Sequence, residues 1–231
     1  VLSDIQNMGY EVVLVSSGAI AVGRNKLNMT AKPGSMRMKQ AAAAVGQCSL
    51  MYLYDKFFGD YDKTVAQILL NADDIEEEEK KENLINTFNA LLEMGVIPIV
   101  NENDSVSYKE IESEDRLFGD NDMLSAVVAV LCRAKHLVIF SDIDGFYDHD
   151  PRLYPNAQLI DQIDTIDDSV YALAGGAGSR RGTGGMRTKL QAASLATSQG
   201  TNTIVTNGKR PEVLYDIIKG GRAGTLFPGK I

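Results

Sequence analysis

A glycine-rich run that ends in a lysine, Gly182 to Lys189 (GTGGMRTK), precedes an alanine-rich stretch with helical spacing. Glycine lets the backbone approach a ligand closely. A helix start offers unbonded N–H groups and the positive end of a dipole, and the lysine adds a localised charge. The spacing matches neither a Walker A loop nor a dinucleotide-binding loop. The run predicts a phosphate site, and a flexible loop before a helix is the alternative.

Amide and carboxylate side chains gather at Asn101 to Asp104 (NEND), where a short apolar run ends. Two acids at this place could bind an ammonium group or a metal ion. The same residue types are also common in tight turns. Because a turn needs only one or two of them, the cluster favours a ligand site.

Ser17, Gly18 and Ala19 follow the first apolar run and open a short helical stretch. Their N–H groups could bind a carboxylate for the reason that a helix start binds a phosphate. Ser17 could equally serve as the cap of that helix. The residues alone do not decide between these interpretations.

Two further acidic clusters stand beside apolar segments. Gly119 to Asp122 (GDND) precedes a helical pattern, and one Asp or Asn is enough to cap a helix, so three in a row indicate that one faces a ligand. Ser141 and Asp142 follow an apolar run, and Asp142 could orient a lysine or help to hold magnesium. Residues 105–118 form a polar segment that resembles a hairpin or a lid.

Short runs rich in Val and Ile alternate with longer segments of helical spacing. The predicted strands are 11–16, 65–70, 96–101, 136–141 and 203–206, and the predicted helices are 36–58, 76–94, 121–133, 185–199 and 211–219. Strands that are apolar nearly throughout are typical of parallel sheets. The pattern predicts an α/β fold, an open three-layer αβα sandwich with a mainly parallel central sheet. Ligands bind beyond the carboxyl ends of such strands, where the polar clusters lie.

Composition narrows the function classes. A net charge of −8 disfavours general nucleic-acid binding. No apolar run reaches membrane-spanning length and no signal peptide is recognisable, so we expect a cytoplasmic protein without a membrane segment. Cys48 and Cys132 are expected to be buried free thiols. His136 and His149 are the only histidines, which leaves little for a histidine metal site or a Ser-His-Asp triad, and no metal-ligating set is predicted.

Taken together, the motifs resemble those of the glutamate 5-kinases of the amino-acid kinase family over essentially all 231 residues. The matching segments are 15–21 (VSSGAIA), 44–47 (AVGQ), 99–104 (IVNEND), 119–122 (GDND) with 124–126 (LSA), 182–190 (GTGGMRTKL) and 224–227 (GTLF). The pair NEND and GDND, in this order and with the glycine run after it, is highly specific.

The resemblance implies transfer of the ATP γ-phosphoryl group to the side-chain carboxylate of L-glutamate, the first step of proline biosynthesis. Motif by motif, it implies that the acceptor is bound by Ser17, Gly18, Asp104, Asn121 and Asp122. The implied ATP site consists of Ser141, Asp142, Thr183, Gly184, Gly185, Met186, Arg187, Thr188 and Lys189. The implied catalytic residues are Lys189, at the transferring phosphoryl group, and Asp142, which positions charged partners. A carboxylate is already nucleophilic, so charge neutralisation is needed rather than a general base.

The resemblance further implies Mg²⁺, feedback inhibition by proline and a homo-oligomer, a dimer or a tetramer. The chain departs from the family pattern in three places. The family's opening strand, with a lysine and a glycine-containing phosphate loop, has no counterpart, segment 105–118 is longer than in the common bacterial form, and no C-terminal PUA domain follows. We therefore expect residues 1–231 to form a single kinase domain without that strand, loop and PUA domain.

Two other functions remain as alternatives. One is a different amino-acid kinase activity, on acetylglutamate, aspartate, carbamate or UMP, although Asp104 and its neighbours favour a substrate with a free ammonium group. The other is a non-catalytic sensor of proline or glutamate, which the missing opening strand would explain.

Overall fold

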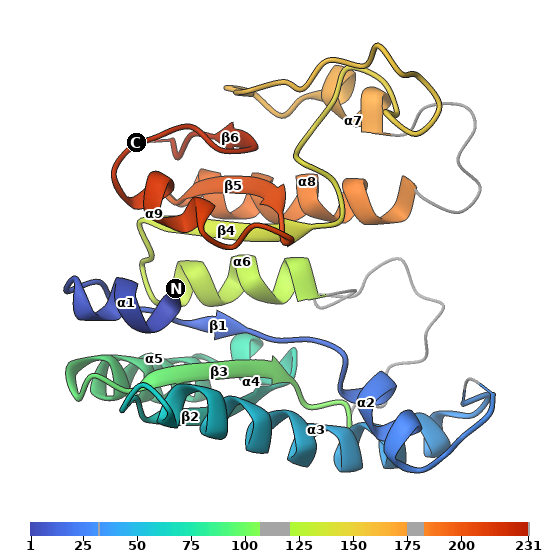
Figure 1. The fold of residues 1–231 in the computed structure, drawn as a ribbon. Helices are drawn as coiled ribbons and strands as arrows, with labels where there is room; N and C mark the ends of the chain where they lie inside the picture. The colour runs from blue at the N-terminus through green and yellow to red at the C-terminus, as the bar shows by residue number, and fades with distance from the viewer. Residues whose placement is uncertain (32, 107–120, 175–182, 231) are drawn as a thin grey trace. The chain divides into compact units, whose positions relative to one another are not determined.

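The computed structural model describes residues 1–31, 33–106, 121–174 and 183–230, with the side chains of Thr183 and Gly184 left out. The chain forms two compact units. The N-terminal unit contains residues 2–121, and the C-terminal unit contains residues 122–231 together with Val1. Each unit has its own three-stranded sheet (Figure 1).

The sheet of the N-terminal unit is entirely parallel, in the order β1-β3-β2. Its strands are β1 (Leu14–Val15), β2 (Val65–Leu70) and β3 (Ile97–Glu102). The central strand β3 is buried from Ile97 to Asn101. Parallel strands end at the same edge, so the polar residues after β1 and β3 share one edge of this sheet.

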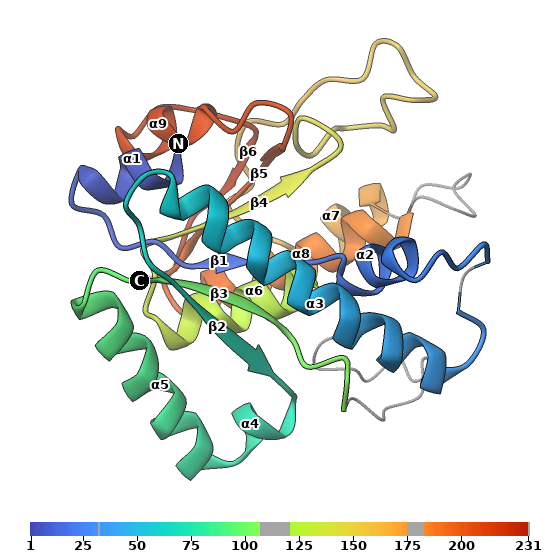
Figure 2. The ribbon, with the colours of Figure 1, turned by 60° about the horizontal axis from the view of Figure 1, so that its bottom comes forward.

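The helices of this unit are α1 (Leu2–Asn7), α2 (Ala19–Lys26), α3 (Met36–Gly59), α4 (Asp73–Glu76) and α5 (Glu78–Glu93). The Ser35 side chain caps α3 by accepting a hydrogen bond from the N–H of Met38. Helix α3 packs against β2 and α5 against β3 (Figures 1 and 2). The ring of Phe88 fixes α5, because it is fully buried.

Helices α2 and α3 touch backbone to backbone. A Cβ added to Gly46 would lie 1.8 Å from the carbonyl oxygen of Ala19, and one added to Gly23 would lie 1.7 Å from that of Ala42. Only glycine at both positions allows this approach. The first turn of α2 is therefore held directly on α3.

The C-terminal unit has a mixed sheet in the order β4-β5-β6, with β4 and β5 parallel and β6 antiparallel. Its elements are β4 (His136–Ser141), β5 (Asn202–Asn207), β6 (Thr225–Phe227), α6 (Asn121–Leu131), α7 (Asp168–Ala174), α8 (Thr183–Ser198) and α9 (Val213–Ile218). Small residues of α6 and α8, such as Ala126 and Ala192, pack with Leu137 and Ile139 of β4 in one core. This core holds the start of α8 against the sheet.

The α/β class is confirmed, and three of the four strand pairings in the described part of the chain are parallel. Strands 65–70 and 136–141 have the predicted bounds, but β1 is only two residues long. The helix predicted for 76–94 is α5, which begins two residues later than predicted because the extended backbone of Glu77 separates it from the short helix α4. Helix α6 ends at Leu131, shortly before Arg133 takes a left-handed conformation (φ +49°). Helix α7 and strand β6 were not predicted.

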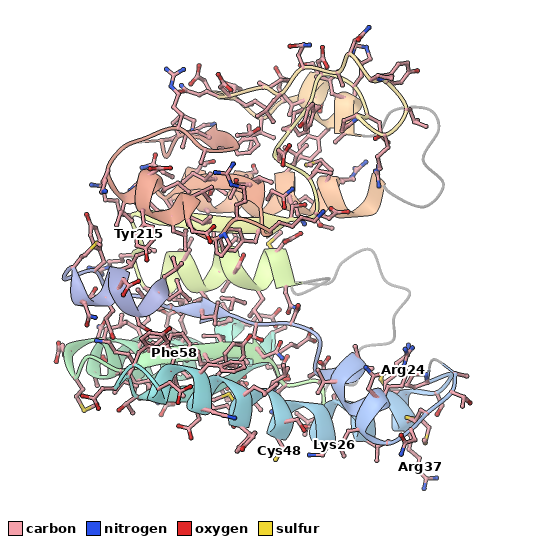
Figure 3. All side chains as sticks on the ribbon, in the orientation of Figure 1. Arg24, Lys26, Arg37, Cys48, Phe58 and Tyr215 are labelled. Carbon is pink, nitrogen blue, oxygen red and sulfur yellow. The ribbon has the colours of Figure 1, made fainter. Side chains whose placement is uncertain are left out.

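Both cysteines are free, as predicted. The prediction that both are buried is wrong, since Cys48 is exposed and Cys132 is half-buried. Figure 3 shows Cys48 projecting outward from α3, whereas Phe58 of the same helix points inward. Among the helices that the structure describes, none is both long and apolar enough to cross a bilayer.

Candidate functional site

The described part of the glycine run, residues 183–189, is helical and opens α8. Helix α8 begins at Thr183, two residues before the predicted start, so Gly184 and Gly185 are helical. The first four N–H groups of a helix have no partner within it. Among the described residues, no atom outside the backbone of the helix would lie within 4 Å of a Cβ on Gly185, so their packing leaves the turn open there. Open N–H groups at the positive end of a helix dipole suit an anion.

Lys189 lies one turn further along α8 and forms an ion pair with Asp122 of α6. The Nζ–Oδ2 distance is 2.8 Å, and the two side chains are only 14% and 17% exposed. Removing charges from water is costly, and the cost is offset only where the geometry is good. Asp122 therefore holds the Lys189 ammonium group in one place.

Further hydrogen bonds fix Asp122. The hydroxyl of Thr188 lies 3.0 Å from the same Oδ2 atom, and Ser125 donates to the Asp122 carbonyl at 2.6 Å. The family resemblance implies that Asp122 binds the acceptor, whereas its described side-chain contacts in this unit are with Thr188 and Lys189, which the same resemblance implies for ATP.

The remaining residues of the run face other directions. Met186 is half-buried and packs against the hydrophobic core. Arg187 lies over the ring of Tyr171 in α7, with its guanidinium carbon 5.8 Å from the ring centre. Burial raises the pKa of Tyr171 above its usual value, while the nearby Arg187 charge opposes this effect. The Arg187 side chain is thereby held on the α7 side of the helix.

Ser141 and Asp142 stand at the end of β4, as predicted. The Ser141 hydroxyl donates to Asp142 Oδ1 at 3.3 Å, and the Asp142 carboxylate is exposed. The described ion pair of Lys189 is with Asp122, and the role of Asp142 in orienting a lysine or holding magnesium stays a prediction. Asp142 thus remains an exposed carboxylate at a strand end.

One contact at this sheet edge was not predicted from the sequence. Asn207, at the end of β5, donates to Asp144 Oδ1 at 2.9 Å and accepts from the N–H of Lys209. Tyr147 donates to the other Asp144 oxygen at 3.3 Å. Burial, together with the Asp144 charge, raises the pKa of Tyr147. Through these bonds Asp144 ties the ends of β4 and β5 together.

In the N-terminal unit, Ser17 and Gly18 are exposed at the end of β1. Gly18 is the N-cap residue of α2, with a left-handed conformation (φ +89°) and no side-chain capping bond. The alternative that Ser17 caps the helix is therefore wrong. The first N–H groups of α2 follow directly and offer donors to an anion.

The NEND cluster ends β3 in a network of amides. Asn101 is buried (2% exposed), and its Nδ2 donates to Gln47 Oε1 of α3 at 2.9 Å, while its Oδ1 accepts from the N–H of Glu102. Asn103 accepts from the Ser105 hydroxyl at 2.7 Å. Asp104 is half-buried at the same strand end. Gln47 therefore contacts this cluster, although the sequence gave it no site role.

The other acceptor candidates are described in part. Asn121 is half-buried and is the first residue of α6. Gly119, Asp120, Gly182 and the segment 107–118 lie outside the described residues. In the ranges 1–31, 33–106, 121–174 and 183–230, no three His, Cys, Asp or Glu side chains are grouped to hold a metal ion.

Comparisons with known proteins agree with this architecture. A family model described as the amino acid kinase family matches residues 1–207. The chain is 56% identical over 230 residues to a protein of Clostridium perfringens named glutamate 5-kinase, covering all of this chain and 85% of that protein. A glutamate 5-kinase of Listeria innocua is 50% identical, with 100% and 83% covered.

Solved structures share the fold at low sequence identity. An isopentenyl phosphate kinase of T. acidophilum superposes with a TM-score of 0.63 at 18% identity, covering 98% of this chain and 86% of that one. A carbamate kinase from Giardia lamblia gives 0.62 at 17%, with 98% and 87% covered. Fold, motif order and full-length identity point the same way, and the chain belongs to the amino acid kinase family.

Proposed function

We propose that this chain transfers the γ-phosphoryl group of ATP to the side-chain carboxylate of L-glutamate and forms γ-glutamyl phosphate. The 56% identity to a glutamate 5-kinase over the whole chain supports the activity. The observation that carries the chemistry is the Lys189 ammonium group, held by Asp122 beside the open first turn of α8.

In this proposal the C-terminal unit binds the nucleotide. The N–H groups at the start of α8 take phosphate oxygens, and Gly185 leaves space for them. Magnesium commonly binds through one or two carboxylates and the substrate's phosphates. The exposed Asp142 carboxylate fits that pattern, and no cage of protein ligands is required. Bound Mg²⁺ would neutralise phosphate charge.

Lys189 is the proposed catalytic charge. An ammonium group has three donors, so it can keep its bond to Asp122 and still donate to a phosphoryl oxygen. Charge on the phosphoryl oxygens is then neutralised by a group that needs no reorganisation during the reaction. Asp122 acts through Lys189 and is a positioning residue.

The N-terminal unit is proposed to bind glutamate. The exposed turn at Ser17 and Gly18 with the first N–H groups of α2 offers donors for a carboxylate. Asp104 and Asn121 offer oxygens for the ammonium group. The acceptor carboxylate is nucleophilic at neutral pH, so its placement matters more than a base.

Proline carries the same α-carboxylate and a secondary ammonium group, so it is proposed to compete for the same groups. A homo-oligomer is proposed on the outer side of α3. Leu53 and Phe57, one turn apart on the same face of the helix, are 39% and 58% exposed there, and Tyr61 just beyond the helix is 67% exposed. Large exposed apolar side chains that gather on one surface are typical of contact sites between proteins.

The proposed activity is tested by incubating full-length protein with ATP, Mg²⁺, L-glutamate and hydroxylamine. We expect γ-glutamyl hydroxamate to form with stoichiometric ADP. Acetylglutamate, aspartate, carbamate and UMP are tested in parallel. Faster ADP release with one of them would reassign the acceptor, and a protein that binds amino acid but gives no thermal shift with ATP would be a sensor.

A further inference from the structure

One face of α3 is turned toward the strand ends of the N-terminal unit. Gln47 and Tyr54 are seven residues apart, which places them two turns from each other on the same face. Gly46 adjoins Gln47 and is buried. Each of these residues contacts a different chain segment beside the proposed glutamate site.

Tyr54 reaches the last residue before the proposed carboxylate-binding turn. Its hydroxyl is 2.8 Å from the Ser16 hydroxyl, and the two are hydrogen-bonded. Ser16 is 5% exposed, and its N–H donates to the Val100 carbonyl of β3 at 2.8 Å. The side chain and the backbone of Ser16 are therefore both fixed, and the exposed Ser17 and Gly18 follow immediately.

Gln47 and Gly46 fix the two neighbouring segments. Gln47 binds Asn101 at the end of β3, at 2.9 Å. Gly46 rests on the Ala19 carbonyl at the start of α2. Helix α3 thus contacts the residue after β1, the first residue of α2 and the end of β3, all within one unit.

We propose that α3 is the element that positions the acceptor site and that Tyr54 is a positioning residue for glutamate. The proposal rests on the proposed function, because it takes the turn at Ser17 and Gly18 as the place where a glutamate carboxylate binds. The Tyr54 hydroxyl fixes Ser16, and Ser16 sets where the N–H groups of that turn point. Tyr54 makes no direct contact with substrate in this arrangement.

The test is the substitution Tyr54→Phe, which removes one oxygen and keeps the ring. Losing one hydrogen bond predicts a rise of about three- to tenfold in the KM for glutamate. We expect kcat and the KM for ATP to stay within about twofold of the parent. A purely structural role would instead lower Tm and change all three constants together.

Two further variants sharpen the result. Tyr52→Phe removes a hydroxyl from the exposed side of the same helix (67% exposed) and is expected to change nothing. Ser16→Ala removes the other partner of the bond. Because both substitutions break the same bond, Tyr54→Phe combined with Ser16→Ala should raise the glutamate KM no further than the larger single effect.

An unchanged glutamate KM in Tyr54→Phe, or fully additive effects in the double variant, would overturn the role of Tyr54. Failure of the proposed function is a separate result. If the parent protein phosphorylates a different acceptor, the glutamate assignment falls, and the KM for that acceptor in Tyr54→Phe then decides the positioning role.

Discussion

The two units hold their candidate site residues in different ways. In the C-terminal unit a charged pair, Lys189 and Asp122, is held at 2.8 Å with little solvent exposure. In the N-terminal unit the groups beside the proposed acceptor turn are uncharged, an amide pair of Asn101 with Gln47 and a hydroxyl pair of Ser16 with Tyr54. The C-terminal unit holds a charged group in a fixed position, whereas the N-terminal unit holds the backbone of a turn in a fixed conformation.

This difference matches what phosphoryl transfer to a carboxylate needs. Charge on the transferring group must be neutralised, which calls for a cation in a fixed position. A carboxylate acceptor needs directed N–H donors, whose positions depend on neighbouring packing and neutral hydrogen bonds. Substitutions in the C-terminal unit should therefore act mainly on kcat, and substitutions in the N-terminal unit should act mainly on the KM for glutamate.

The largest expected effect is that of Lys189→Ala. Loss of a charge aimed at the transition state lowers kcat by about 10²- to 10³-fold. The free energy of unfolding should also fall, because the substitution leaves the Asp122 carboxylate with little exposure and without its cation. Steady-state kinetics and urea unfolding measure the two effects.

Two variants separate these effects. Adding Asp122→Asn to Lys189→Ala removes the carboxylate charge that faced Lys189, so part of the lost unfolding free energy should return while kcat stays low. Lys219→Ala removes an exposed lysine of the same unit and should leave both quantities unchanged. A kcat of Lys189→Ala close to that of the parent would contradict the assignment of a catalytic charge to this unit.

Gly46→Ala probes the packing of the N-terminal unit. The new Cβ would be 1.8 Å from the backbone oxygen of Ala19, which no side-chain rotation relieves. The two helices must move apart, so we expect a loss of about 3 kcal/mol, the upper end of the range for overpacking, and a higher KM for glutamate. Urea unfolding and a glutamate titration measure these changes.

The control is Gly59→Ala, at the last residue of the same helix. A Cβ there would have no atom of the described residues within 4 Å outside the backbone of the helix. Alanine is favoured over glycine in helices, so this variant should be neutral or more stable by up to about 1 kcal/mol. Equal stability of the two variants would show that contact between α2 and α3 does not shape the acceptor side.

The sequence predicted the strands and the fold class better than the contacts that hold the candidate residues. The bounds of strands 65–70 and 136–141 were predicted correctly, because their apolar runs are short and bounded by polar residues. Lys189 was singled out as a phosphate ligand because glycine, helix start and lysine stand together in the chain, and that role stays a prediction. The α/β class followed from the alternation of these patterns.

The hydrogen-bond and ion-pair partners of the candidate residues could not be predicted from local sequence patterns. Asp122 and Lys189 are 67 residues apart, and Asn101 and Gln47 are 54 apart, so no local pattern joins them. The requirement for glycine at Gly23 and Gly46 arises only when two helices meet. The role of Asp142 beside a lysine or magnesium stays a prediction, while the ion pair of Lys189 with Asp122 was not foreseen.

The smallest expected effect is on His136, the first residue of β4 in the C-terminal unit. Burial lowers its pKa below the usual 6.5, and nearby Lys135 lowers it further. Its Nδ1 atom is buried and has no hydrogen-bond partner in the described part of the chain. As the pH falls through 6.5, the unfolded chain binds a proton before the folded protein does. Stability from His136 is therefore present above this pH and is lost below it.

His136→Gln should remove this loss. Between pH 8 and pH 5.5 the unfolding free energy of the parent should fall more than that of the variant, while between pH 8 and pH 7 the two should run in parallel. Urea unfolding across this range measures the difference. If the two proteins keep a constant offset down to pH 5.5, protonation of His136 has no part in the stability of the C-terminal unit, and charge sensitivity there is confined to the pair of Lys189 with Asp122 and the other carboxylates.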